Sequence, residues 1–372
     1  MFMTTATPPE ERIRLARPAL DARENKAIAA VLESGMLVSG AKVERFEDMV
    51  RERCGRAHAI AVGSGTAALI LAMRALDLGA SEVLVPALTW PSPAHAITVL
   101  GGRARLADVD PASWNGSAAS FNAARTNETR GIVAIDQFGV PAEHDAIRQL
   151  GLPIIEDAAC AIGSTRHGKA AGSFGLISTL SFHPRKVITT GEGGMCLTDD
   201  AEIAKRLRAM RNHGQSTPGT FILASSNERL TEMQAAMGIV QMEKLSEILT
   251  RRRAIATHYR SALSHSGLTF QMHDDAETNE QTMGALVPST WSSSQRDQLL
   301  AFTGEQGVEC GKLSYDLSTL ESLPGPHLEV PNTQSIVARG FALPLHTLMS
   351  DADVERVIRT LRSGLQRMGE SA

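Results

Sequence analysis

Short apolar runs alternate with longer segments of helical period between residues 50 and 200. The runs have the length of buried strands and are rich in Val, Ile, Leu and Ala. They cover residues 58–62, 82–86, 104–109, 131–135, 153–157, 178–182 and 194–198. The intervening segments carry apolar stripes, as in residues 66–78, where Ala68, Leu69 and Ala72 share one face. This alternation is typical of a mostly parallel sheet with helices on both faces, so we predict an α/β fold.

The pattern changes after residue 200. Helical spacing continues, but strands become fewer and shorter, which indicates a second, α+β unit. The predicted elements are helices at 201–213 and 232–248, a helix after the arginine triplet, strands near 284–288, and helices at 295–304 and 351–364. We interpret the triplet, residues 251–253, as a solvated helix face. The predicted domains are therefore a large α/β domain over residues 1–248, with an N-terminal arm, and a small C-terminal α+β domain over residues 249–372.

Composition narrows the possible partners. The chain has 372 residues, 43% of them hydrophobic, which is enough for a large core. Its 37 basic and 41 acidic residues give a net charge of −4, so we expect a small-molecule substrate, and neither nucleic acid nor membrane as a partner. No apolar run approaches membrane-spanning length and the N-terminus lacks a signal-peptide core, so a cytoplasmic protein is expected. The scattered cysteines disfavour a zinc site and a disulfide framework; they are Cys54, Cys160, Cys196 and Cys310.

Two residues suggest a specific chemistry. Lys186 lies between a predicted strand and a Thr-Thr-Gly-Glu-Gly-Gly turn, and Asp157 ends an earlier strand. A lysine that forms a Schiff base, together with a carboxylate against the pyridine nitrogen, is the pairing that pyridoxal 5'-phosphate requires. Two ordinary interpretations compete with this one: Lys186 as a surface lysine, and Asp157 as the cap of the following helix. Glu156 is expected to point to the opposite face of the sheet.

A glycine-containing turn follows the first predicted strand. Its backbone N–H groups at Gly65, Thr66 and Ala67, with the Thr66 hydroxyl, are suited to a phosphate at a helix N-terminus. Such turns also serve as plain strand-to-helix connections. Ser181 could add a hydroxyl, and Trp90 could lie flat on a cofactor ring or simply pack in the core. The turn lacks the dinucleotide glycine fingerprint, which disfavours a nicotinamide oxidoreductase.

Taken in order along the chain, these motifs and several others are specific for one enzyme family. The chain resembles sugar aminotransferases of the DegT/DnrJ/EryC1/StrS family over about residues 15–361. The resemblance rests on residues 39–40, 46–47, 63–69, 89–90, 108–110, 156–159, 181–184 with 186, 190–194, 211–214, 227 with 229, and 234–236. It implies a fold type I pyridoxal phosphate transferase, with a large domain built on a mostly parallel central sheet and a smaller C-terminal α+β domain.

The family also implies roles for single residues. Lys186 would form the Schiff base and Asp157 would hold the pyridine nitrogen, which makes these two the expected catalytic residues. The expected cofactor contacts are Gly65, Thr66, Ala67, Trp90, Asp157, Cys160, Ser181, Lys186 and Asn227, with Asn227 reaching the phosphate of the other subunit. The resemblance therefore implies a homodimer with shared active sites. Its activity would move an amino group from glutamate or glutamine to a keto sugar, in many cases nucleotide-linked.

Some positions depart from the family. Cys160 stands where a Gln or His is usual and cannot make the same strong hydrogen bond near the ring. The segment 311–318 lacks a histidine that is often found there, so the substrate contacts are expected to differ. A cyclitol or other non-nucleotide ketone therefore stays open as the acceptor, and so does a non-catalytic regulatory paralogue. A dehydratase is disfavoured, because such relatives typically replace the lysine with histidine.

Overall fold

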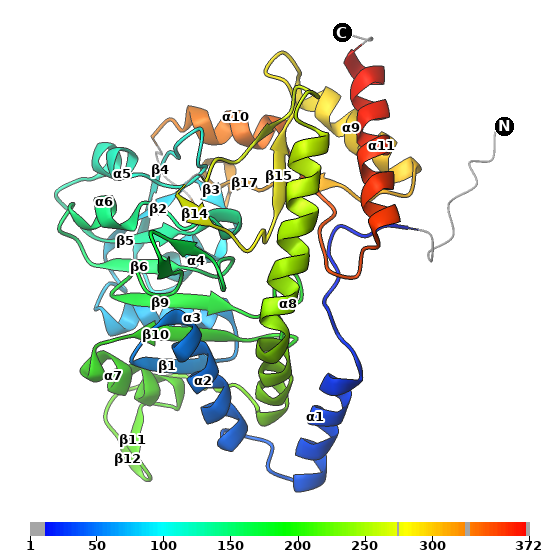
Figure 1. Cartoon of the computed structure of the whole chain (residues 1–372). Helices are drawn as coiled ribbons and strands as arrows, with labels where there is room; N and C mark the ends of the chain where they lie inside the picture. Colours follow the sequence, from blue (N-terminus) through cyan, green and yellow to red (C-terminus); the bar gives the residue numbers. More distant parts are fainter. Residues whose placement is uncertain (1–11, 274, 324–327, 370–372) are drawn as a thin grey trace.

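A seven-stranded sheet forms the centre of the protein (Figure 1). The computed structural model describes residues 12–273, 275–323 and 328–369. The strand order is β1-β10-β9-β6-β5-β2-β4, and β10 alone runs antiparallel to its neighbours. The strands are β1 His58–Val62, β2 Glu82–Pro86, β4 Arg103–Ala107, β5 Thr129–Ile135, β6 Ile154–Asp157, β9 Ile177–Ser181 and β10 Gly194–Thr198. The mostly parallel sheet predicted from the apolar runs is confirmed.

Helices cover both faces of this sheet because its strands are apolar on both sides. In β1, Ile60 and Val62 join the core on one face, whereas Ala59 and Ala61 join the core on the other. The first face is covered by α3 Gly65–Ala75, α4 Ser92–Thr98 and α7 Ala201–Arg211. The second is covered by α2 Ala41–Cys54, α5 Ala118–Ala124, α6 His144–Arg148 and part of α8 Glu232–Ala262.

The long helix α8 connects the two parts of the fold (Figure 1). It begins at a capping box in which Thr231 and Gln234 satisfy each other's backbone N–H groups. The buried carboxylate of Glu232 accepts hydrogen bonds from the first N–H groups of α2, at 2.8–3.0 Å, and so fixes that helix against α8. Helix α1 Ala22–Ser34 packs along α8 as well.

Helix α8 corrects the interpretation of the arginine triplet. The sequence predicted one helix that ends at residue 248 and another after the triplet, but a single helix of 31 residues runs through both. Arg252 is buried and donates to the carbonyl oxygens of Asn279, Glu280, Gln281 and Leu345, so the prediction of a solvated face is wrong for this residue. The boundary predicted between residues 248 and 249 falls inside α8, and the division into two domains stays a prediction.

A second, antiparallel sheet lies beside the C-terminal half of α8. Its strands, in spatial order, are β13 Thr269–Phe270, β15 Met283–Leu286, β18 Gly340–Leu343 and β16 Gly311–Lys312. Helices α9 Ser293–Glu305 and α11 Asp351–Gly369 pack around it, and Tyr259 of α8 belongs to the same core. Within the described ranges, no helix is both long and apolar enough to cross a bilayer.

Shorter elements connect these layers. The pair β17 Tyr315–Asp316 and β3 Leu88–Thr89 joins the C-terminal part of the chain to the large sheet. A small hairpin, β11 Gln215–Thr217 with β12 Thr220–Phe221, projects from the lower end of the molecule in Figure 1. The remaining elements are η2 Gln137–Gly139, η3 Leu317–Thr319, α10 Pro331–Arg339, and a three-stranded sheet of β7 Thr165–Arg166, β8 Lys169–Ala170 and β14 Ala276–Glu277.

The sheet register brings several strand ends to one edge. Val62 lies opposite Gly194, which lies opposite Ser181, and Asp157 lies opposite Thr179. The carboxyl ends of β1, β6 and β9 therefore meet at the same edge, where open α/β sheets bind their ligands.

Candidate active site

A polar cradle forms where α3 begins. Ser64 caps the helix in an extended conformation, and its Oγ accepts a hydrogen bond from Ala67 N at 3.1 Å. At Gly65, an added Cβ would lie 2.8 Å from the Cβ of Ser181. Only glycine therefore allows the helix N-terminus to approach the end of β9 so closely. Three of the predicted phosphate contacts, Gly65, Thr66 and Ser181, thus lie together with the positive end of a helix.

Ser92 completes this cradle and was not identified from the sequence. The hydroxyl groups of Thr66 and Ser92 are 2.8 Å apart. Ser92 is the first residue of α4, in the segment that also carries Trp90. Hydroxyl groups converging on the N–H groups of a helix N-terminus form a site for a phosphate ester. The cradle therefore fits the phosphate of pyridoxal phosphate.

Asp157 is buried at the end of β6. Its Oδ1 accepts a hydrogen bond from Ala159 N at 3.0 Å, so the capping contact considered for this residue is present. Burial raises the pKa of Asp157, against the opposing effects of the Ala159 N–H group and the positive charge of Lys186. A carboxylate in this environment is stabilised by a cation placed against it. The protonated ring nitrogen of a pyridine has that charge.

Glu156 faces away from this site, as expected. Its carboxylate accepts hydrogen bonds from Ser178 Oγ and from three backbone N–H groups of the segment 172–175. Asp136 and His144 lie close enough to Glu156 that the three could be considered as metal ligands. The Glu156 oxygens already accept hydrogen bonds from Ser178 and the segment 172–175. We therefore interpret Asp136, His144 and Glu156 as residues that anchor β6, and not as metal ligands.

Lys186 is half-buried, and its amine donates a hydrogen bond to Cys160 Sγ at 3.0 Å. Burial alone would lower the pKa of Lys186, but the contact with Cys160 and the charge of Asp157 hold the pKa above its ordinary value. The two residues expected to be catalytic therefore interact electrostatically. Cys160, expected to be a cofactor contact without the strong hydrogen bond of a Gln or His, contacts the amine of Lys186 directly.

A second residue missed by the sequence analysis fixes Cys160. The side-chain amide of Asn279 donates to the carbonyl oxygens of Cys160 and Ile162, at 2.8 and 2.9 Å. Asn279 is fully buried and lies far along the chain, next to β14. No local pattern around an isolated Asn predicts such a contact. It ties the loop after β6 to the C-terminal part of the fold.

Trp90 lies at the rim of the site. Its side chain is 59% exposed, which excludes the core-packing interpretation. The ring of Tyr315 meets it edge to face, with ring centroids 5.3 Å apart, because the pairing of β17 with β3 places Tyr315 next to Thr89. The segment 311–318, which differs from the usual family sequence, thus supplies an aromatic residue at the site. Two aromatic rings at one rim are suited to cover a flat ligand.

Asn227 does not join the cradle of its own chain. It lies in an exposed segment next to Asn212, and its Oδ1 accepts a hydrogen bond from Arg229 N at 3.3 Å. Across the described residues, its side chain makes no hydrogen bond to Thr66 or Ser181. Its predicted role in a partner subunit stays a prediction.

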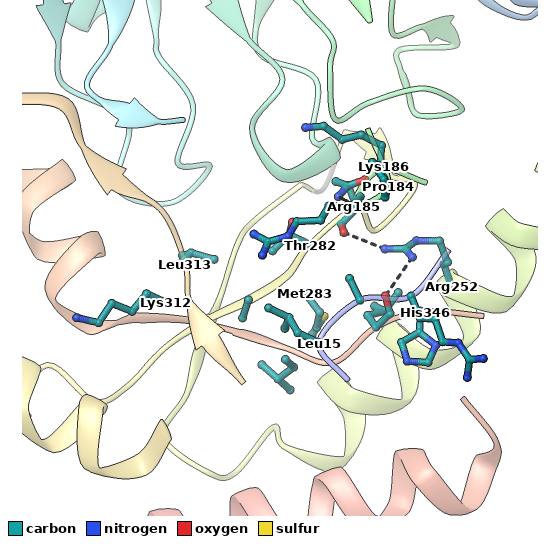
Figure 2. Close-up of a pocket in the computed structure, with 16 residues that line it drawn as sticks. Leu15, Pro184, Arg185, Lys186, Arg252, Thr282, Met283, Lys312, Leu313 and His346 are labelled. Atoms are coloured by element: carbon teal, nitrogen blue, oxygen red, sulfur yellow. Dashed lines mark hydrogen bonds between the residues drawn. The ribbon is translucent and has the colours of Figure 1, made fainter. Parts of the chain in front are cut away.

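A cavity of about 150 Å³ opens beside Lys186 (Figure 2). Its walls come from the N-terminal arm at residues 15–17, from residues 184–186, and from the second sheet with Arg252 of α8. In Figure 2 the Lys186 side chain extends toward the strand ends of the large sheet, away from Leu15 and Met283. The cavity therefore adjoins Lys186 on the side of the C-terminal part of the chain, and the amine itself extends away from it.

Comparisons with known proteins agree with this geometry. A family model described as the DegT/DnrJ/EryC1/StrS aminotransferase family matches residues 18–362. GDP-perosamine synthase of Caulobacter vibrioides is 33% identical over 363 residues, which cover 94% of this chain and 97% of that protein.

Two solved structures are similar in both sequence and fold. The aminotransferase TlmJ from Streptoalloteichus hindustanus has a TM-score of 0.91 and 29% identity, with 96% of this chain and 100% of that chain covered. DesI, crystallised in the presence of its TDP-sugar product, has a TM-score of 0.90 and 31% identity, with 97% and 95% covered. The fold class predicted from the sequence is confirmed.

Proposed function

The chain belongs to the DegT/DnrJ/EryC1/StrS aminotransferase family, and we propose that it moves an amino group from glutamate or glutamine to the ketone of a nucleotide-linked keto sugar. It is a pyridoxal phosphate-dependent aminotransferase. The proposal of a nucleotide-linked acceptor is supported by two relatives, one named for a GDP-linked amino sugar and one crystallised with a TDP-sugar.

The observation that carries the proposal is the placement of Lys186 and Asp157 at one sheet edge, beside the cradle of Gly65, Thr66, Ser92 and Ser181. The cradle would hold the phosphate and Asp157 the ring nitrogen, with Lys186 as the covalent attachment point. When bound, pyridoxal phosphate supplies an electron sink for the bonds at the donor α-carbon. The presence of both Lys186 and Asp157 at one site argues against a non-catalytic paralogue.

The residues of the chain then have distinct tasks. Because the pKa of Lys186 is raised in the free site, its Nζ carries a proton at neutral pH and has to release it before it acts as a nucleophile. With cofactor and donor bound, the same nitrogen would remove the proton from the donor α-carbon. Asp157, a buried carboxyl group near Lys186, would hold the protonated ring nitrogen in place. Trp90 and Tyr315 cover the rim and limit the access of water.

We further propose a homodimer with shared active sites. Several large apolar side chains are exposed on the single chain, on the hairpin β11–β12 and on the loop between α1 and α2. Phe221, Ile222 and Met36 are 62%, 55% and 66% exposed. Such a surface is suited to contact with a second copy. Asn227 lies close behind the hairpin in sequence, so the same contact would bring it toward the partner's cradle.

The cellular location is also proposed. All four cysteines are free, and Cys160 Sγ accepts a hydrogen bond from the amine of Lys186. This use of cysteine is suited to a reducing compartment, which supports a cytoplasmic enzyme.

The test uses purified protein reconstituted with pyridoxal phosphate. Borohydride reduction followed by peptide mass analysis should place the cofactor on Lys186, and Lys186→Ala should give no adduct. Glutamate should then yield 2-oxoglutarate, and a panel of GDP- and TDP-linked keto sugars should contain an acceptor. Amination of a cyclitol ketone alone would overturn the sugar proposal. An adduct elsewhere than Lys186 would overturn the site assignment.

A further inference from the structure

The segment that carries Asn227 is exposed, yet its backbone is held at defined places. Glu228, the next residue, forms two backbone hydrogen bonds of 2.9 Å. One joins it to Arg211 at the end of α7, and the other joins it to Gly63, just before the phosphate cradle. Residues 224–229 contain no buried side chain. Contacts from outside the segment therefore decide where Asn227 lies.

Arg74 of α3 provides such a contact with its side chain. Its Nη1 atom donates a hydrogen bond to Ser225 Oγ at 2.9 Å, and its Nη2 atom donates one to Ala224 O at 2.6 Å. The Ser225 hydroxyl in turn donates to Met210 O of α7 at 2.7 Å. One planar guanidinium group thus binds two acceptors at the beginning of the segment and fixes it against two helices.

Helix α3 connects this contact to the phosphate cradle. The helix begins at Gly65 in the cradle, and Arg74 lies about 14 Å further along its axis, at about 1.5 Å per residue. Most of its side chains are buried in the core between the sheet and the helices that cover it. A packed helix of this kind does not bend or slide freely. The cradle and Asn227 of one chain are therefore fixed relative to each other.

This fixed arrangement matters for a symmetric dimer. A two-fold interface uses the same surface of both chains, so a residue that reaches across it does so in both directions. A hydrogen bond from Asn227 to a phosphate weakens once its length exceeds about 3.2 Å. The position of the segment on one chain therefore decides whether the phosphate site of the other chain is complete.

We propose that Arg74 is a positioning residue for the cofactor site of the partner subunit. It fixes the segment that carries Asn227, and thereby the phosphate contact that Asn227 makes across the dimer. The inference rests on the proposed homodimer with shared active sites. Arg74 itself lies outside the cradle, so the defect of an Arg74 variant appears in the cofactor site of the other chain.

The test measures how much pyridoxal phosphate is needed to load Lys186. Loading is followed by borohydride reduction and peptide mass analysis over a range of cofactor concentrations. Arg74→Met removes both donors and keeps an apolar stem, and Ser225→Ala breaks the same contact from the other side. We expect the half-saturating concentration to rise about tenfold in each variant, with thermal unfolding nearly unchanged.

Arg206→Met is the matched control. Arg206 is half-buried like Arg74 and also connects α3 with α7, through hydrogen bonds to Ala75 O and Asp77. Its printed partners all lie outside residues 224–229. This variant should load Lys186 at the same cofactor concentration as wild type.

Mixed dimers separate an effect on the partner from an effect within one chain. Chains with different affinity tags are co-expressed, and the mixed dimer is purified through both tags. The first mixed dimer pairs an Arg74→Met chain with a Lys186→Ala chain, so its remaining Lys186 faces Asn227 of a chain with intact Arg74. The second pairs wild type with an Arg74→Met/Lys186→Ala chain, so its remaining Lys186 faces Asn227 of the altered chain.

The two mixed dimers should behave differently. We expect the first to load like wild type and the second to need about tenfold more cofactor. The reverse result would assign Arg74 to the site of its own chain and overturn the proposal. Equal weakening in both mixed dimers would overturn it as well, because it would indicate a general loss of structure. So would normal loading of the Arg74→Met and Ser225→Ala homodimers.

Failure of the proposed function is distinguishable from failure of this role. If wild type forms no adduct on Lys186, the aminotransferase proposal fails. If wild type sediments as a monomer in analytical ultracentrifugation, the proposal of shared active sites fails. Asn227→Ala provides the last distinction: if it weakens loading in the homodimer while Arg74→Met and Ser225→Ala do not, the role of Arg74 alone is refuted.

Discussion

Gly65→Ala tests whether the close contact between α3 and β9 forms the phosphate cradle. An ordinary contact of a Cβ atom begins at about 3.4 Å, whereas the new Cβ would lie 2.8 Å from the Cβ of Ser181. The helix N-terminus and the strand end would have to separate by roughly 0.6 Å. A shift of that size lengthens a hydrogen bond of about 2.9 Å to about 3.5 Å, at the limit of a useful contact.

The expected magnitude follows from this displacement. A hydrogen bond to a charged group is worth about 1.5–3 kcal/mol, so losing one raises the Kd of pyridoxal phosphate roughly ten- to hundredfold. Overpacking by one methyl group costs about 1–3 kcal/mol of stability, which the better helix propensity of Ala offsets by at most about 1 kcal/mol. Cofactor affinity should therefore change more clearly than the free energy of unfolding.

The assay is equilibrium binding of pyridoxal phosphate to the cofactor-free protein, with thermal unfolding alongside. Gly304→Ala is the matched control, because Gly304 lies inside α9 and its added Cβ would meet no atom within 4 Å. That variant should bind the cofactor normally and gain up to about 1 kcal/mol of stability. If Gly65→Ala is folded and binds pyridoxal phosphate within a factor of about two of wild type, the cradle assignment is refuted.

Three further variants probe other parts of the structure. Asp157→Asn should lower kcat on the order of 10²-fold or more, because it removes the buried charge opposite the ring nitrogen; a near-normal kcat would contradict its role. Cys160→Ala should lower the pKa of Lys186, since burial is then opposed by Asp157 alone, so the pH profile of cofactor attachment should move to lower pH; an unmoved profile would speak against the contact. Arg252→Met should reduce the free energy of unfolding by on the order of 3–5 kcal/mol in denaturant titrations, because four carbonyl oxygens lose their donor, while Arg359→Met serves as the surface control; equal effects would refute the buried role.

The strands of the large sheet could be predicted from sequence because their apolar runs are local. The bounds predicted for β2 and β10 match those observed, Glu82–Pro86 and Gly194–Thr198. Once the strands are known, the residues at their ends are known too. Asp157 and the cradle residues could therefore be predicted to lie at the carboxyl edge of the sheet, where ligands bind. Lys186 was found in the same way, from the turn that follows it. These predictions depend on short-range pattern and on the common direction of parallel strands.

Contacts between distant segments could not be predicted in this way. Three consecutive arginines have the pattern of a surface, and only the tertiary fold supplies the carbonyl oxygens that bury Arg252. The hydrogen bonds of Asn279 to the Cys160 loop join residues more than a hundred positions apart. The cavity beside Lys186 combines an N-terminal arm, a strand-end segment and the second sheet. None of these groupings leaves a periodic signal in the chain.

The continuity of α8 limits how the enzyme can respond to its substrates. A helix of 31 residues is a stiff rod about 46 Å long, and both sheets are attached to it. Swinging one half of the molecule over the other would require this rod to bend between Glu232 and Ala262, where it contains no proline. Opening and closing of the catalytic centre is therefore confined to side chains and connecting loops, and its overall shape is set before any ligand arrives.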